Sequence, residues 1–194
     1  MTMLEAEEPR LSVAEYLERE MSAEVKNEYV HGELFAMTGA SIPHNLVTAN
    51  VITAFNNALD GKDCSVFASD TKIEIEPGAH YVYPDVSVVC GDVLFGQNRN
   101  DVLANPMVIV EVLSKSTRDY DRGSKFKAYR RIGSMTDYLL VDQYAMAVEH
   151  FHRERRGFWT MAELEGEEAI MELSALGVAL KVADFYRRLE RVGR

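Results

Sequence analysis

The sequence predicts a mixed α/β (α+β) fold, in which a mixed central sheet is flanked by helices. The strongest indication is the apolar run Met107–Leu113, which is typical of a buried central strand. A helical segment, 121–132, follows it and leads to a second buried strand at 137–142. The chain has 194 residues, and we expect a single domain over 1–194 with residues 1–10 flexible.

Two helices and a hairpin are expected before the main strands. Ser12 and Glu15 have the spacing of a capping box, which opens a short helix. His31-Gly32 is typical of a tight turn between two strands, and Ser41 followed by Pro43 indicates the start of a second helix. The predicted elements are a helix at 12–21, a hairpin of 28–30 and 33–37, and a helix from 41 to about 60.

Strand patterns dominate the remainder of the chain. The predicted strands are 65–69, 72–76, 81–90, 107–113, 137–142, 145–153 and 158–164. Pro77-Gly78 marks a turn, and the polar segment 91–106 is expected to be a loop. The helix that follows the central strand stops at Gly133, and a last helix is predicted at 183–191.

The composition limits the classes of function. The net charge of −10 argues against a general nucleic-acid coat protein, so any DNA contact requires a local basic patch. No apolar run is long enough for a membrane span, and the acidic N-terminus does not resemble a signal peptide. Cys64 and Cys90 form no disulfide framework, and we expect reduced, half-buried thiols in a cytoplasmic protein.

Three charged residues stand out against apolar surroundings. Glu111 interrupts the central strand, and burial of a carboxylate requires a cation or a proton. Asp85 follows Pro84 and heads an apolar strand, while Lys125 borders the buried side of the next helix. The alternatives are a structural ion pair for Glu111, an ordinary strand-end Asp85, and a Lys125 stem that lies along the sheet.

The order of several motifs is more specific than any one of them. They are Tyr83-Pro84-Asp85, Ile109–Ser114, Asp121–Tyr129 and Asp137–Asp142, together with Glu28–Leu34 and His44-Asn45. From about Ser12 to Phe185, the chain resembles the Uma-two family of restriction-endonuclease-like proteins, within the PD-(D/E)XK nuclease superfamily. The resemblance implies a restriction-endonuclease-like αβββαβ core, with an extra N-terminal hairpin and C-terminal strands.

The resemblance also implies a metal site. Asp85, Glu111 and the Val112 carbonyl would hold Mg²⁺ (or Mn²⁺), which activates water and phosphate for hydrolysis. The superfamily usually places a lysine two residues after the Glu, where this chain has Leu113; the amine is expected to come from Lys125 instead. Additional candidates for the site are Glu33, His44, Asp70 and Tyr129.

DNA is the expected substrate, and a homodimer is the expected assembly. The basic residues available for a DNA backbone are Lys115, Arg118, Arg122, Arg130 and Arg131, unless they form a solvated helix face. One alternative function is a catalytically inactive interaction domain with a Glu111–Lys125 ion pair. Another is a metal-dependent phosphoesterase that acts on a small nucleotide.

Overall fold

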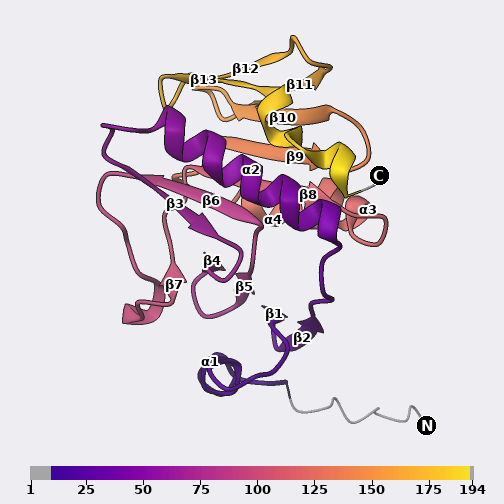
Figure 1. Ribbon diagram of the computed structural model, residues 1–194. Coiled ribbons are helices and arrows are strands. Elements are labelled where there is room, and N and C mark those ends of the chain that lie inside the picture. The colour runs from indigo at the N-terminus through magenta and orange to yellow at the C-terminus, as the bar shows by residue number, and fades with distance from the viewer. Residues whose placement is uncertain (1–9, 193–194) are drawn as a thin grey trace, which may run out of the picture.

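The computed structural model describes residues 10–192, so the predicted flexibility of 1–10 concerns residues that lie mostly outside it. Figure 1 shows a large sheet crossed by one long helix, with a smaller sheet beside the N-terminal part of the chain. The helices are α1 (Val13–Glu20), α2 (Ile42–Ala58), α3 (Arg118–Tyr120) and α4 (Phe126–Tyr129). The remaining turns are 3-10 turns η1 (Gly96–Asn98), η3 (Val182–Tyr186) and η4 (Leu189–Arg191), and the π-helical turn η2 (Asp121–Lys125).

The large sheet has the strand order β11-β10-β9-β8-β6-β3. Its strands are β3 (Cys64–Ala68), β6 (Val86–Cys90), β8 (Val108–Leu113), β9 (Asp137–Asp142), β10 (Ala147–Arg153) and β11 (Trp159–Glu165). The β8–β9 pair is parallel and the other pairs are antiparallel. Along the chain, α2, β3, β6, β8, η2–α4 and β9 follow the order αβββαβ, as the resemblance implied.

The smaller sheet has the strand order β2-β1-β5-β4-β7. It comprises β1 (Asn27–Val30), β2 (Glu33–Ala36), β4 (Lys72–Glu76), β5 (His80–Val82) and β7 (Val102–Leu103). Tyr16 from α1 stacks on Tyr29, with ring centroids 4.9 Å apart, and Tyr81 completes a small aromatic core. A separate hairpin is formed by β12 (Ile170–Leu173) and β13 (Val178–Lys181).

The central strand separates two hydrophobic clusters, because successive side chains point to opposite faces of a sheet. Val110 and its alternate neighbours pack on the α2 face, where Val51 and Phe55 are fully buried. Ile109 and Leu113 pack on the opposite face, against the side chains of α4. Glu111 belongs to this second face and is therefore enclosed between the sheet and the crossover that leads to β9.

The expected strand 81–90 is divided between the two sheets. The chain ends β5 at Val82, passes through Tyr83-Pro84-Asp85, and enters β6 at Val86. Pro84 has no N–H for a ladder hydrogen bond, which favours a change of sheet at this position. Asp85 consequently lies at the junction of the two sheets rather than inside one long strand.

The C-terminal prediction was wrong in two respects. The single helix expected at 183–191 is replaced by η3 and η4, because Arg188 between them has a left-handed φ of 63° that an α-helix cannot accommodate. The β12–β13 hairpin was not predicted, since its strands are only four residues each and carry weak patterns. The helix expected at 121–132 instead runs over 118–129, as α3, the π-helical turn η2 and α4 in succession.

The expectation of reduced cysteines is corrected as well. Cys64 and Cys90 are half-buried, as predicted, but they form a disulfide. The sequence argument relied on cellular compartment, whereas the β3–β6 register places the two residues directly opposite each other. Within residues 10–192, no helix combines the length and apolar character that crossing a membrane requires.

Candidate active site

A cluster of charged side chains is enclosed where the two sheets approach each other. Glu111 comes from the central strand β8, Glu28 from β1, and Asp85 from the link between β5 and β6. Asp121 and Lys125 come from the π-helical turn η2, whose ends both face inward. Residues that are widely spaced in the sequence thus meet in one region of the fold.

Lys125 lies at the centre of this cluster. Its side chain is 6% exposed, and its Nζ lies 2.9 Å from Glu111 Oε1 and 3.1 Å from Glu28 Oε1. Asp121 Oδ1 is 3.9 Å from the same ammonium group. Lys127, two residues further along, is exposed. The helical geometry therefore directs Lys125 inward, as its spacing predicted, and Lys127 toward solvent.

Two tyrosines fix the orientation of the buried glutamates. The Tyr129 hydroxyl donates a 2.7 Å hydrogen bond to Glu111 Oε1, the same oxygen that Lys125 approaches. The Tyr120 hydroxyl donates to Glu28 Oε2 at 3.1 Å. These contacts hold both carboxylates in place and direct them toward the Lys125 ammonium.

Asp85 is anchored next to Glu111 by the backbone. Its Oδ2 accepts a 2.7 Å hydrogen bond from the N–H of Val112, the residue that follows Glu111. Its side chain remains 17% exposed, so it forms the more open edge of the cluster. The Asp85 carboxylate is thereby held beside Val112, the position in β8 directly after Glu111.

His44 is a neighbour of Asp85 on the first turn of α2, where Ser41 is the N-cap. His44 Nε2 lies 3.3 Å from Asp85 Oδ2, and within residues 10–192 its buried Nδ1 finds no hydrogen-bond partner. Burial lowers the pKa of this imidazole, but the hydrogen bond and charge of Asp85 outweigh that effect and raise the pKa overall. His44, an additional candidate from the sequence, is therefore a buried neighbour of Asp85.

The electrostatics of the cluster are unbalanced. Three carboxylates, those of Glu28, Glu111 and Asp121, lie within 3.9 Å of the single ammonium group of Lys125, and Asp85 adds a further negative charge near Glu111. Burial raises the pKa of Glu111 well above its usual range, and Lys125 opposes this only in part. Burial also disfavours the charge on Lys125, but the surrounding carboxylates outweigh it and hold its pKa well above the ordinary value. An additional cation would relieve the excess negative charge.

The donor set fits a hard divalent cation. Tyr129 and Lys125 approach Oε1 of Glu111, and Val112 and His44 approach Oδ2 of Asp85. The second oxygen of each carboxylate takes no part in these four contacts. Oxygen ligands that are oriented by neighbouring donors are the arrangement that Mg²⁺ and Mn²⁺ prefer.

Most of the residues expected at the site lie together. Asp85, Glu111, Val112 and Lys125 form its core, with His44 and Tyr129 in direct contact. Glu33 and Asp70 do not join them and are corrected here. Glu33 is exposed on the outer hairpin strand β2, and Asp70, with 89% of its side chain exposed, pairs with Lys26.

Two acidic members were missed by the sequence reasoning. Glu28 lies on the inner hairpin strand β1 and is buried, whereas Glu33 on the outer strand was chosen from the resemblance. What distinguishes them is the position of β1 between the strands β2 and β5, which no local pattern in the sequence indicates. Asp121 lies four residues before Lys125, a spacing that places both on one helical face.

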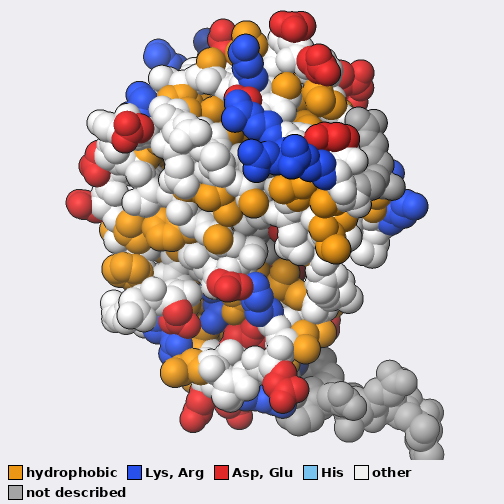
Figure 2. Space-filling model, in the orientation of Figure 1, with side chains coloured by type: hydrophobic (Ala, Val, Ile, Leu, Met, Phe, Trp, Pro, Cys, Tyr) orange, Lys and Arg blue, Asp and Glu red, His pale blue; other side chains and the backbone are white. Residues whose placement is uncertain are grey.

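The predicted basic patch is partly neutralised. Arg122 Nε donates a 2.8 Å hydrogen bond to Glu149, and Arg131 donates a 2.7 Å hydrogen bond to Glu76. Figure 2 shows acidic and basic side chains together at the constriction between the two lobes, and a group of Lys and Arg side chains over the C-terminal turns. The surface charge is therefore mixed over the visible face, without one continuous basic stripe.

The mixed sheet in αβββαβ order defines a nuclease-like fold. A solved protein structure from Anabaena variabilis ATCC 29413, described as a putative nuclease belonging to DUF820, matches this fold with a TM-score of 0.75. It shares 16% sequence identity, and the match covers 92% of this chain and 99% of that one. At this identity the likeness establishes the fold alone.

The chain belongs to the Uma2 family, described as "Putative restriction endonuclease", whose model matches residues 13–183. The resemblance seen in the sequence is thereby confirmed. Two relatives from Synechocystis sp. (strain PCC 6803), "Uncharacterized protein slr1290" and "Uncharacterized protein sll1609", are each 36% identical to it. The matches cover 93% and 87% of this chain, and 94% and 95% of those proteins.

Proposed function

We propose that this protein is a metal-dependent endonuclease that hydrolyses phosphodiester bonds of DNA. The observation that carries the proposal is the enclosed cluster in which acidic groups outnumber the single Lys125 ammonium. Asp85, Glu111 and the Val112 carbonyl would hold Mg²⁺ (or Mn²⁺). Once bound, the ion supplies Lewis acidity toward the phosphate and the attacking water.

The residues of the chain would orient the reactants and compensate charge. In hydrolysis, the water oxygen forms a bond to phosphorus, one phosphorus–oxygen ester bond breaks, and a proton of the water passes to the leaving oxygen. The Lys125 ammonium group donates hydrogen bonds toward this region and stabilises negative charge as it develops. Tyr129 and the Val112 N–H keep the carboxylates of Glu111 and Asp85 in fixed orientations.

The position of Lys125 compensates for the departure from the superfamily pattern. Leu113, where the usual lysine would lie, is buried in the apolar cluster. Lys125 instead reaches Glu111 at 2.9 Å from the following helix. This contact supports the assignment of the catalytic amine to Lys125, although the amine comes from a different element of the fold.

A second candidate function has its own support in the same distance. The 2.9 Å pair between Lys125 and Glu111 satisfies a buried carboxylate without any metal. A catalytically inactive interaction domain with this structural ion pair would retain the same fold. The two candidates differ in whether the cluster binds a divalent ion and whether DNA is cut.

The experiment incubates the purified protein with supercoiled plasmid and with single-stranded DNA, with and without Mg²⁺ or Mn²⁺. We expect nicking that requires the ion and is abolished in Asp85→Asn and in Glu111→Gln. Asp70→Asn is the matched control, because that carboxylate is exposed and lies outside the cluster. Nicking that persists in either site variant would refute the assignment. Absence of both nicking and ion binding would favour the inactive interaction domain.

The assembly is a separate part of the proposal. A homodimer would allow two sites to act on opposite strands of a duplex, as the symmetry of most oligomers permits. Sedimentation velocity across a range of protein concentrations tests this expectation. A monomer at all concentrations, with nicking of single strands only, would exclude the paired arrangement.

A further inference from the structure

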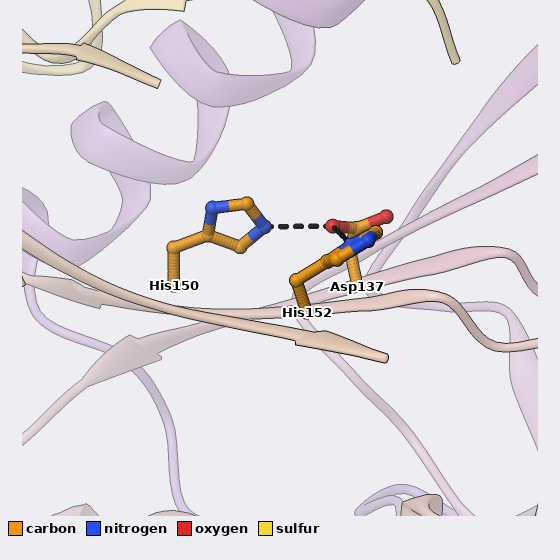
Figure 3. A group of neighbouring side chains, drawn as sticks. All are labelled: Asp137, His150 and His152. Carbon is orange, nitrogen blue, oxygen red and sulfur yellow. Dashed lines mark hydrogen bonds and ion pairs between the residues drawn. The ribbon is translucent and has the colours of Figure 1, made fainter. Parts of the chain in front are cut away.

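Asp137, His150 and His152 form a second cluster of ligand-type side chains on the large sheet. Asp137 begins β9, and both histidines come from the neighbouring strand β10. The β9–β10 register places His152 directly opposite Asp137, with His150 two residues along the same strand. All three side chains therefore project from one face of the sheet, as Figure 3 shows.

The donor atoms of the three side chains converge on a small volume. His150 Nε2 lies 2.7 Å from Asp137 Oδ1, and His152 Nδ1 lies 2.8 Å from the same oxygen. One ligand atom from each residue lies within 4.8 Å of the other two. Tetrahedral Zn²⁺ with bonds of about 2.0–2.1 Å needs donors roughly 3.3 Å apart. Each imidazole nitrogen would therefore move about 0.5–0.6 Å further from Asp137 Oδ1 to admit the ion.

The surroundings of Asp137 favour a cation. Its side chain is fully buried, and the groups that contact it as ion-pair partners are the two imidazoles, without a lysine or arginine among residues 10–192. A buried carboxylate is costly unless a cation or hydrogen bonds compensate it. Thr136 Oγ1 donates a 2.8 Å hydrogen bond to Asp137 Oδ2, which turns Oδ1 toward the histidines. Such outer hydrogen bonds orient the ligands of metal sites.

This cluster is separate from the candidate active site. Leu139 and Val141 of β9 pack in the hydrophobic cluster on the α2 face of the sheet. Asp137 lies two residues before Leu139, so its side chain points to the same face, whereas Glu111 points to the α4 face. The nitrogen-rich donor set also differs in chemistry from the oxygen ligands around Glu111. Two imidazoles and one carboxylate suit a borderline ion such as Zn²⁺ more than Mg²⁺.

We propose that Asp137, His150 and His152 bind a divalent transition-metal ion of the Zn²⁺ type. The site joins the first residue of β9 to β10 and leaves a fourth position for water. His152, with 26% of its side chain exposed, is the most accessible of the three ligands. The inference does not rest on the proposed nuclease function, because none of its three residues contacts Lys125 or Glu111 among the interactions described above.

The test begins with protein freed of metal by a chelator. Zn²⁺ is added in competition with a chromophoric chelator, and Co²⁺ is added to record its visible absorption. We expect one high-affinity Zn²⁺ per chain, Co²⁺ bands of tetrahedral coordination, and a thermal midpoint that rises with Zn²⁺ concentration. His152→Asn should weaken Zn²⁺ binding by at least about 100-fold, because it removes a ligand outright.

Three further variants make the outcome decisive. His31→Asn is the matched control, because His31 is an exposed histidine at a positive φ that Asn also adopts. Asp85→Asn should also retain full Zn²⁺ affinity, whereas Thr136→Val should reduce it about 10–100-fold by loss of the outer hydrogen bond. Circular dichroism of each metal-free variant verifies that it is folded. Zn²⁺ binding that is unchanged in folded His152→Asn, or absent in the unmodified protein, would overturn the proposal. The three side chains would then have only a structural role, as hydrogen-bonded partners between β9 and β10.

Discussion

Replacement of Lys125 by methionine tests the electrostatic design of the candidate active site. Methionine keeps much of the side-chain length but removes the ammonium group that lies 2.9 Å from Glu111 and 3.1 Å from Glu28. Both carboxylates would then be buried without their cation. Loss of one partner of a buried ion pair costs about 3–5 kcal/mol, so we expect Lys125→Met to lower the free energy of unfolding by about this amount in the absence of metal.

Mg²⁺ should restore part of this loss if the cluster binds the ion. At a concentration 100 times its Kd, a ligand specific for the folded state adds about 2.7 kcal/mol to the free energy of unfolding. Lys125→Met removes a competing positive charge, so its affinity for Mg²⁺ should exceed that of the unmodified protein. The difference in stability between the two should therefore narrow when Mg²⁺ is present, while nicking of plasmid falls about 10²–10³-fold.

Urea unfolding with and without Mg²⁺ measures both quantities. Lys127→Met is the control, because Lys127 is exposed and its loss should change the free energy of unfolding by no more than about 0.5 kcal/mol. A stability difference between Lys125→Met and the unmodified protein that stays the same with Mg²⁺ would refute ion binding at the cluster. Full nicking activity in a folded Lys125→Met would refute the role of the amine.

Three further predictions concern the neighbours of the cluster and the core. Asp85 raises the pKa of His44, so the imidazolium stabilises the fold below the ordinary histidine pKa of 6.5, and this contribution is lost as the pH rises through the higher folded-state value. His44→Gln should remove that pH dependence from urea unfolding. In the unmodified protein, Mg²⁺ affinity should rise with pH as the competing imidazolium loses its proton, and His44→Gln should remove this rise as well. A pH dependence that is the same in His44→Gln would contradict the ion pair between His44 and Asp85. Tyr129→Phe, which deletes the 2.7 Å hydrogen bond to buried Glu111, should cost about 1.5–3 kcal/mol in the same assay, and a neutral effect would show that the bond contributes little. Phe55→Ala should cost about 3–5 kcal/mol in thermal unfolding without any change in Mg²⁺ affinity, since Phe55 packs on the opposite sheet face from Glu111; altered affinity would contradict the separation of the two faces.

The sequence contained enough information to predict the central part of the fold. The apolar run around Glu111 and the helical spacing of Lys125 are strong local signals, and the structure places both as expected. The helix starts were equally predictable, because the Ser41 N-cap and the Ser12–Glu15 capping box both depend on neighbours a few residues apart. The resemblance then supplied the order of elements that local patterns could not provide.

Features that depend on pairing between distant segments were not predictable from local patterns. Glu28 and Glu33 are similar polar positions in one hairpin, and only the pairing of β1 with β5 buries the former. The meeting of Cys64 with Cys90 likewise follows from strand register. The Asp137, His150 and His152 cluster was missed because its members lie on two strands whose relative register no single segment specifies.

The charged cluster lies between the two sheets and has a mechanical consequence. Glu28 belongs to the smaller sheet and Glu111 to the larger one, and Lys125 holds both by its ammonium group. The charged groups that would take part in the reaction therefore also connect the smaller sheet to the larger one. A cation bound to Glu111 competes with Lys125 for that carboxylate, so ion binding and the contact between the two sheets are thermodynamically coupled.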